Sequence, residues 1–249
     1  MRFSLFETSL IAIMVALATW STVGVRDPLA EHRDIETGPL AARYGPTRFS
    51  AGPEEWIIRD YFGDRRGGVF LDVGAGHYRD DSNTYYLESV LGWSGLAVDA
   101  VESWAGGYRE HRPRTRFRVA FVSDRSDAEA SIFVNPLDRR LSSSTRELPA
   151  SRGLALERRV KTITLDDLLA AEGLTTVDFM SMDIELSEPA ALAGLDLARA
   201  RPSLICIEAH YEVRQAILDY FASRGYRLLA RYLRADRANL YFAPIDARW

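Results

Sequence analysis

Short apolar runs in this 249-residue chain end in residues that could do chemistry, namely carboxylates, glycines, a serine and a histidine. The runs are continuous and are bounded by polar residues or glycine, as in strands that are buried on both faces of a parallel sheet. Because parallel strands end at a common edge, we expect the groups at their carboxyl ends to gather in one crevice. These groups are Asp72, Gly74, Ala75 and Gly76; Asp99; Ser123 and Asp124; Asp183 and Glu185; and Glu208 with His210.

The first group forms a glycine turn over residues 72–76 (D-V-G-A-G), where a ligand could approach the main chain. A dinucleotide-binding G-x-G-x-x-G fingerprint would need a third glycine where Arg79 stands, so NAD or FAD is disfavoured. Asp99 ends the next run and is suited to bind the two hydroxyls of a ribose. This is the arrangement of S-adenosylmethionine-dependent methyltransferases; the alternative is a tight turn that holds no ligand. The predicted cofactor-binding residues are Asp72, Gly74, Ala75, Gly76, Asp99, Ser123 and Asp124.

His210 is the first candidate for a catalytic base, because an imidazole with its ordinary pKa of about 6.5 can accept a proton near neutral pH. A neutral hydroxyl is a poor nucleophile, so its methylation calls for a base or a metal ion that helps to remove the proton. Asp183 and Glu208 are predicted to end neighbouring strands, where they could orient the imidazole or hold a divalent cation together with His210. The alternatives are a structural histidine, and a carboxylate that caps a helix or pairs with arginine.

Predicted strands and helices, which must position these residues, alternate along the chain. The apolar runs predict strands at 69–73, 95–98, 117–122, 177–182 and 204–207. Amphipathic stretches between them predict helices at 83–91, 165–171 and 213–224, the second of which is capped by Thr164. Two further runs, 226–233 and 239–243, are suited to an antiparallel pair. The sequence therefore predicts an α/β fold with a doubly wound, mostly parallel, Rossmann-like sheet and a C-terminal antiparallel hairpin.

Residues 8–25 carry no charge, and positions 10–17 read L-I-A-I-M-V-A-L. A helix of this length spans about 27 Å, close to the hydrocarbon thickness of about 30 Å. We predict an N-terminal hydrophobic helix that anchors the chain in a membrane over 1–25, a linker or arm over 26–53, and a catalytic domain over 54–249. The alternatives for the first segment are a cleavable secretory signal and an interfacial or buried helix. Arginines that follow the segment predict a single-pass protein whose catalytic domain is cytoplasmic.

The composition excludes several functional classes. A single cysteine, Cys206, excludes a disulfide framework and a cysteine-based zinc site within one chain. The formal net charge of −4 disfavours a general nucleic-acid binder, which usually shows a basic field. Arginines recur at strand period at positions 112, 114, 116 and 118, which predicts a solvated sheet edge or a face for an anionic substrate.

The chain resembles the FkbM-type methyltransferases over about residues 44–244. The matching segments are F-L-D-V-G-A-G at 70–76, S-N-T-Y-Y-L-E at 82–88, G-W-S-G-L-A-V-D at 92–99, T-I-T-L-D-D at 162–167, M-D-I-E-L-S-E at 182–188, I-E-A-H at 207–210 and N-L-Y-F-A-P at 239–244. The resemblance implies a class I methyltransferase fold, S-adenosylmethionine as methyl donor and usually O-methylation. It also implies that Gly74 and Gly76 contact the methionine end of the cofactor and Asp99 its ribose. Relatives usually show D-x-E-G-x-E, whereas Leu186 stands at the glycine position here.

We therefore expect a membrane-anchored O-methyltransferase that acts on a sugar, a glycolipid or another small metabolite, with a lipid-linked glycan among the candidate substrates. S-adenosylmethionine is the expected cofactor, and it is a cytoplasmic metabolite, which also favours a cytoplasmic catalytic domain. A divalent metal at Asp183, Glu208 and His210 is a further candidate, and no nucleic-acid partner is expected. The alternatives are a catalytically silent, membrane-tethered binding module of the same fold, and an enzyme that uses another nucleotide-type cofactor.

Overall fold

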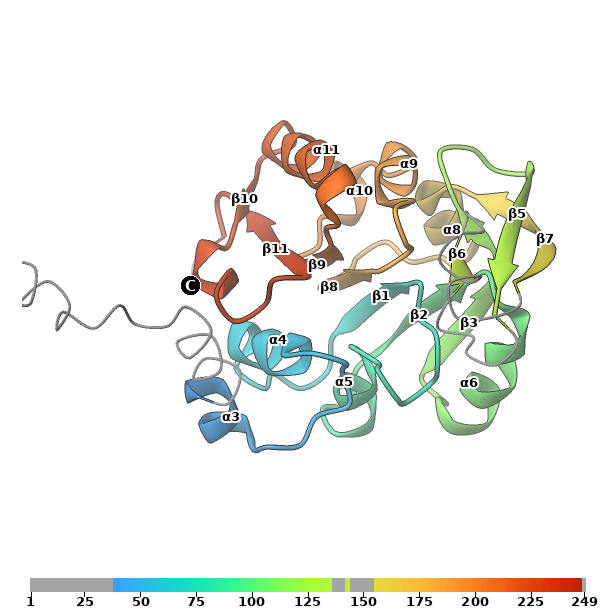
Figure 1. Ribbon diagram of the computed structural model, residues 1–249. Helices are drawn as coiled ribbons and strands as arrows, with labels where there is room; N and C mark the ends of the chain where they lie inside the picture. Colours follow the sequence, from blue (N-terminus) through green and yellow to red (C-terminus); the bar gives the residue numbers. More distant parts are fainter. Residues whose placement is uncertain (1–37, 136–141, 144–154, 248–249) are drawn as a thin grey trace, which may run out of the picture.

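A computed structural model describes residues 38–135, 142–143 and 155–247 of the chain. A seven-stranded sheet crosses the middle of Figure 1 and consists of β1 (Val69–Val73), β2 (Ser94–Asp99), β3 (Thr115–Val119), β8 (Phe179–Met182), β9 (Leu204–Glu208), β10 (Tyr226–Leu228) and β11 (Asn239–Pro244). The strand order is β10-β11-β9-β8-β1-β2-β3. The strands from β9 to β3 run parallel, whereas β11 is antiparallel to both β9 and β10. The predicted mostly parallel sheet with a C-terminal antiparallel hairpin is confirmed.

Helices cover both faces of this sheet, as Figure 1 shows. One face carries α4 (Glu54–Phe62), α5 (Tyr85–Ser89) and α6 (Ala105–His111); the other carries α8 (Leu165–Ala171), α9 (Glu188–Ala193), α10 (Leu197–Ala200) and α11 (Tyr211–Ala222). In β1, Phe70 packs in the core under α4 and α5, while Leu71 and Val73 pack in the core under α8, α9 and α11. Because both faces are covered, the strands are continuous apolar runs rather than alternating ones.

Local signals fix the ends of the helices that follow the strands. The predicted helix at 165–171 is confirmed as α8, and the Thr164 hydroxyl caps it by accepting the Asp167 N–H at 3.1 Å. α11 ends shortly before Gly225, whose φ of +72° lies in the left-handed region. α5 is shorter than the predicted 83–91 helix, and Asn83 instead donates through Nδ2 to Ser181 Oγ on β8 at 2.9 Å.

The predicted strand at 117–122 is wrong, because the structure divides this run between two sheets. β3 ends at Val119, and the Ala120 N–H donates to the Asp99 carbonyl oxygen at 3.1 Å where the chain leaves the main sheet. The second sheet consists of β4 (Phe121–Val122), β5 (Glu129–Val134), β6 (Ser142–Ser143) and β7 (Leu156–Ile163). Its order is β4-β7-β5-β6, with β4 parallel and β5 antiparallel to β7. Because β7 contains several charged residues, it does not appear as an apolar run in the sequence, and this sheet was not predicted.

Helix α3 (Pro39–Tyr44) forms within the predicted linker and packs against α4. Arg43 Nη1 lies 3.2 Å from Asp60 Oδ1 on α4, and the Tyr44 hydroxyl donates to the same oxygen at 3.4 Å. The later part of the linker is thus fastened to the sheet domain. The domain boundaries at residues 26 and 54 stay predictions, and the anchor helix predicted over 1–25 lies outside the described residues.

The predicted localisation, a single-pass membrane protein with a cytoplasmic catalytic domain, is corrected by the structure. Throughout residues 38–135, 142–143 and 155–247, no helix combines the length and the apolar composition that crossing a bilayer demands. α11, for example, has 12 residues, whereas a spanning helix needs about 20. The uncharged segment at 8–25, on which the localisation was based, lies outside the described residues.

Candidate active site

The glycine turn at residues 74–76 joins the carboxyl ends of β1 and β2. The Gly74 and Ala75 N–H groups both donate to the Val98 carbonyl oxygen, at 2.9 and 3.2 Å. The Gly76 N–H donates to Asp99 Oδ2 at 2.9 Å. The structure therefore brings the predicted glycine turn and the predicted ribose-binding carboxylate into direct contact.

The two glycines of this turn differ in what surrounds them. Gly74 has a φ of +80° and Gly76 a φ of +56°, and both values favour glycine. A Cβ atom on Gly74 would lie 1.8 Å from the Asp183 carbonyl oxygen, so the chain after β8 can approach the turn only where no side chain is present. A Cβ atom on Gly76 would meet no atom within 4 Å, so the space beside this residue is open.

Asp72 lies beneath the turn and supports it. Its side chain is buried, and Oδ2 accepts a hydrogen bond from the Thr84 hydroxyl at 2.7 Å. Burial raises the pKa of Asp72 to about 6, an effect that the Thr84 hydrogen bond and the charge of Arg112 oppose. Arg112 in turn donates to Thr84 Oγ1 at 3.2 Å and pairs with Glu88 at 2.5 Å. Direct contact between Asp72 and a cofactor stays a prediction.

Arg112 corrects the prediction that the alternating arginines form a solvated edge or an anion-binding face. Its side chain is buried, and Nη1 donates to the Tyr78 carbonyl oxygen at 2.8 Å. Another bond, from Nη2 to Thr115 Oγ1 at 3.2 Å, ties the guanidinium to the start of β3. The alternation of arginines alone could not predict that Arg112 is buried, because Arg114, Arg116 and Arg118 share the same spacing and are exposed.

Four polar side chains meet at the carboxyl ends of β8 and β9. His210 Nε2 lies 3.1 Å from Glu208 Oε2 and 3.6 Å from Glu185 Oε2. Asp183 and Glu208 lie beside each other, and the contact between their carboxyl groups contributes to the pKa of each. The His210 side chain is 42% exposed, so its ring remains open to a ligand. The structure brings the three predicted catalytic residues together with Glu185, which the sequence also placed after the predicted strand at 177–182 but without a catalytic role.

Carboxyl groups gather along this edge of the main sheet. Burial is the largest cause that raises the pKa of every carboxyl group involved, and neighbouring carboxylates raise most of them further. The pKa of Asp99 rises to about 6 and that of Glu208 to about 9. A cation brought to this edge would relieve the repulsion. The six carboxyl groups are Asp72, Asp99, Asp183, Glu185, Glu188 and Glu208.

A metal ion could be held by Glu185, Glu208 and His210. One donor atom from each residue lies within 4.8 Å of the other two. Two carboxylate oxygens and one imidazole nitrogen suit a divalent cation. This trio differs from the predicted one, in which Asp183 stood in place of Glu185.

The backbone beside the site is strained at two consecutive residues. Glu185 has a φ of +52° and Leu186 a φ of +72°, and neither is glycine. A side chain in this left-handed conformation costs roughly 1–2 kcal/mol. Glycine, which the family resemblance implies at position 186, would adopt it without that cost, so Leu186 is a departure with a structural consequence.

Leu186→Gly is expected to be more stable than Leu186→Ala by about 0.5–1 kcal/mol. Both variants remove the leucine side chain, but only glycine tolerates the positive φ; its greater freedom in the unfolded chain offsets part of the gain. Urea unfolding of the two variants measures the difference. Equal stability of the two variants would show that the conformation at residue 186 carries no strain.

Ser123 and Asp124, predicted to bind the cofactor, follow β4 of the second sheet rather than β3 of the main sheet. The Ser123 N–H donates to the Ile163 carbonyl oxygen at 3.0 Å, and Asp124 pairs with the exposed Arg125 at 3.2 Å. Within the described parts of the chain, no hydrogen bond or ion pair joins Ser123 or Asp124 to the glycine turn. Their contribution to binding stays a prediction.

Comparison with known families identifies a methyltransferase domain. Residues 72–228, more than half of the chain, match the sequence profile of the Methyltransferase FkbM domain. The matched range contains the glycine turn, Asp99 and the carboxylate–histidine group. No curated protein matches the chain.

Solved structures that are similar to the chain share little sequence with it. The TehB-like SAM-dependent methyltransferase from Corynebacterium glutamicum is 15% identical with a TM-score of 0.45, over 88% of this chain and 100% of its own. The precorrin-6y C5,15-methyltransferase from Geobacter metallireducens is 12% identical with a TM-score of 0.44, over 79% and 89%. The O-methyltransferase from Bacillus cereus, in complex with SAH, is 13% identical with a TM-score of 0.41, over 92% and 94%.

Proposed function

Because the chain belongs to the FkbM methyltransferase family, we propose that it transfers a methyl group from S-adenosylmethionine to a hydroxyl of a sugar, a glycolipid or another small metabolite. The observation that carries this proposal is the row of buried carboxyl groups beside an open glycine turn. The methyl donor is a sulfonium, and its positive charge suits an edge where carboxylates repel one another. Bound there, it would supply an activated methyl group for in-line displacement.

The residues around the glycine turn fit a nucleoside cofactor. The open space at Gly76 leaves room for a ligand close to the main chain. Each oxygen of Asp99 accepts one backbone N–H, from Gly76 at 2.9 Å and from Val101 at 2.7 Å. A carboxylate oxygen has two lone pairs, so both oxygens can still accept a ribose hydroxyl. Asp99 is therefore held in position by the protein and keeps acceptor capacity for the ligand.

His210 is the residue that we propose as general base. Glu208 and Glu185 lie on the Nε2 side of the ring, which favours the tautomer with its proton on Nε2. Nδ1 then carries the lone pair, and it has no hydrogen-bond partner among the residues that the structure describes. As the acceptor oxygen bonds to the methyl carbon and the carbon–sulfur bond breaks, Nδ1 would take the hydroxyl proton. The carboxylates stabilise the imidazolium that results.

Metal assistance is the second candidate mechanism, favoured by the spacing of Glu185, Glu208 and His210. A divalent cation there would lower the pKa of the acceptor hydroxyl in place of a base. Activity that survives exhaustive chelation supports His210 as a base. Activity that chelation abolishes and Mg²⁺ restores supports the metal.

Calorimetry with S-adenosylmethionine tests the proposed cofactor. Asp99→Ala is expected to weaken binding at least tenfold, because a charge-assisted hydrogen bond contributes about 1.5–3 kcal/mol. Asp99→Asn keeps one acceptor oxygen and is expected to bind with intermediate affinity, which separates ligand contact from damage to the turn. Asp219→Ala, on the exposed side of α11, is the control and should bind normally.

Two outcomes would redirect the assignment. If the unmutated protein does not bind S-adenosylmethionine, the proposed cofactor is wrong. If it binds the cofactor but transfers no radiolabelled methyl group to glycan and lipid extracts, a catalytically silent binding module of the same fold is favoured. We do not propose nucleic acid as the acceptor, because the carboxylate-rich edge would repel its phosphates.

A further inference from the structure

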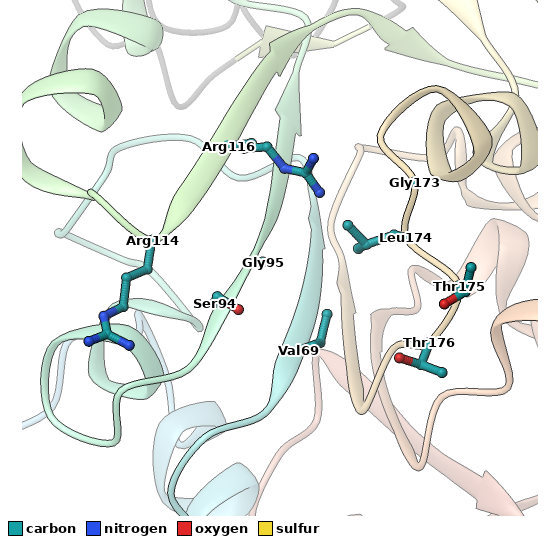
Figure 2. Close-up of a pocket in the computed structure, with 9 residues that line it drawn as sticks. All are labelled: Val69, Ser94, Gly95, Arg114, Arg116, Gly173, Leu174, Thr175 and Thr176. Atoms are coloured by element: carbon teal, nitrogen blue, oxygen red, sulfur yellow. The ribbon is translucent and has the colours of Figure 1, made fainter.

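A pocket lies at the opposite edge of the main sheet from the glycine turn. It has a volume of about 230 Å³ and is shown in Figure 2. Val69 and Ser94, the first residues of β1 and β2, form its floor, and residues 173–176 after α8 form its wall. β1 separates this pocket from Gly74, and a strand of five residues spans about 15 Å. The pocket is therefore a separate site.

Hydrogen-bond donors around this pocket are exposed and are not occupied by described residues of the protein. The hydroxyls of Ser94, Thr175 and Thr176 line it, and they make no hydrogen bond to any residue that the structure describes. The backbone N–H groups of Thr175 and Thr176 likewise donate to no acceptor within the described ranges. The nine described residues that line the pocket include no acidic side chain.

Positive charge exceeds negative charge beside the pocket. Arg116 Nη1 lies 3.2 Å from Glu172 Oε2, and Arg118 pairs with the other oxygen of the same carboxylate. One buried carboxylate thus pairs with two guanidinium groups. The third arginine, Arg114, donates from Nη1 to the Gly92 carbonyl oxygen at 3.3 Å. Figure 2 shows the Arg116 guanidinium directed towards Leu174 across the pocket.

We propose that this pocket binds a phosphate group carried by a small molecule, with Arg116 as its charged partner. A phosphate has at least three acceptor oxygens, which match one guanidinium and three hydroxyls better than the two oxygens of a carboxylate do. The volume admits a phosphate with a small substituent but is below the 300–1,000 Å³ or so of pockets that hold drug-sized ligands. The site is independent of the proposed methyl transfer.

Calorimetric titration with inorganic phosphate and with glucose 1-phosphate tests the proposal, at constant ionic strength maintained with chloride. Both probes are expected to bind with millimolar or lower dissociation constants, and tighter binding of the ester would identify a phosphate ester as the ligand class. Arg116→Gln is expected to weaken binding at least tenfold. Arg118→Gln removes a guanidinium from the same Glu172 but does not line the pocket, so it should change affinity less than twofold.

Three results would overturn the proposal: no heat with either probe, equal binding by Arg116→Gln and the unmutated protein, or equal losses in the two arginine variants. S-adenosylmethionine binding, measured on the same samples, should not change in either variant. This readout keeps the phosphate site and the proposed cofactor site distinguishable, and it reports whether each variant is folded.

Discussion

Gly74→Ala is expected to lower the free energy of unfolding by about 3–5 kcal/mol and to abolish S-adenosylmethionine binding. The new Cβ atom would stand 1.8 Å from the Asp183 carbonyl oxygen, so the chain after β8 must move away from the turn. That movement displaces Asp183, which is paired with Glu208. The φ of +80° at residue 74 adds a second cost for any side chain. Urea unfolding measures the loss of stability, and calorimetry measures the loss of binding.

Gly76→Ala is the matched control, two residues along the same turn. It carries a similar conformational cost, since the φ of Gly76 is +56°, but its Cβ atom would meet nothing within 4 Å. We expect a loss of only about 1–2 kcal/mol. If both alanine variants unfold at the same urea concentration, contact with Asp183 is not the reason for glycine at position 74.

His210→Ala is expected to lower the rate of methyl transfer by about 10²–10⁴-fold while leaving the affinity for S-adenosylmethionine within about twofold. The reason is that the imidazole would act on the acceptor hydroxyl, whereas the cofactor would be held by the glycine turn and Asp99. Initial rates of radiolabelled methyl incorporation, together with calorimetry, separate the two effects. Added imidazole should restore part of the lost rate if proton removal is what the variant lacks.

His111→Ala is the control for this variant, because the His111 side chain is 44% exposed against 42% for His210 but lies at the end of α6. It should retain the full rate. A rate in His210→Ala close to that of the unmutated protein would remove His210 from the mechanism. A joint loss of rate and cofactor affinity would instead indicate that His210 supports the binding site.

The main sheet could be predicted from the sequence because its strands are buried on both faces and therefore appear as unbroken apolar runs. The run at 204–207, for example, became β9 with one residue added. The second sheet could not be predicted in the same way. β7 reads L-E-R-R-V-K-T-I, and its charged residues face solvent, so the segment lacks an apolar run. Residues 121 and 122 were consequently assigned to the wrong sheet.

The sequence could predict only those residues of the candidate site that come directly at the end of a strand. Asp99, Glu208 and His210 stand at such ends, and their positions followed from the strand assignments. The burial of Arg112 could not be inferred, because it depends on Glu88 and Thr84, which reach it from a different part of the chain. The sequence did indicate that Leu186 stands where the family resemblance implies glycine. Only the structure shows that the backbone at this residue has a positive φ.

The position of β11 has a consequence for any chain that stops short of it. β11 lies between β9 and β10, although it comes after both in the chain. A released chain that ends at residue 238 contains both flanking strands but not the strand that joins them, so the β9 edge and the Tyr226–Leu228 segment are left without a partner. Exposed strand edges of this kind favour aggregation. Such a truncated chain would therefore be prone to aggregate, whereas the six residues of β11 cover the exposed edge.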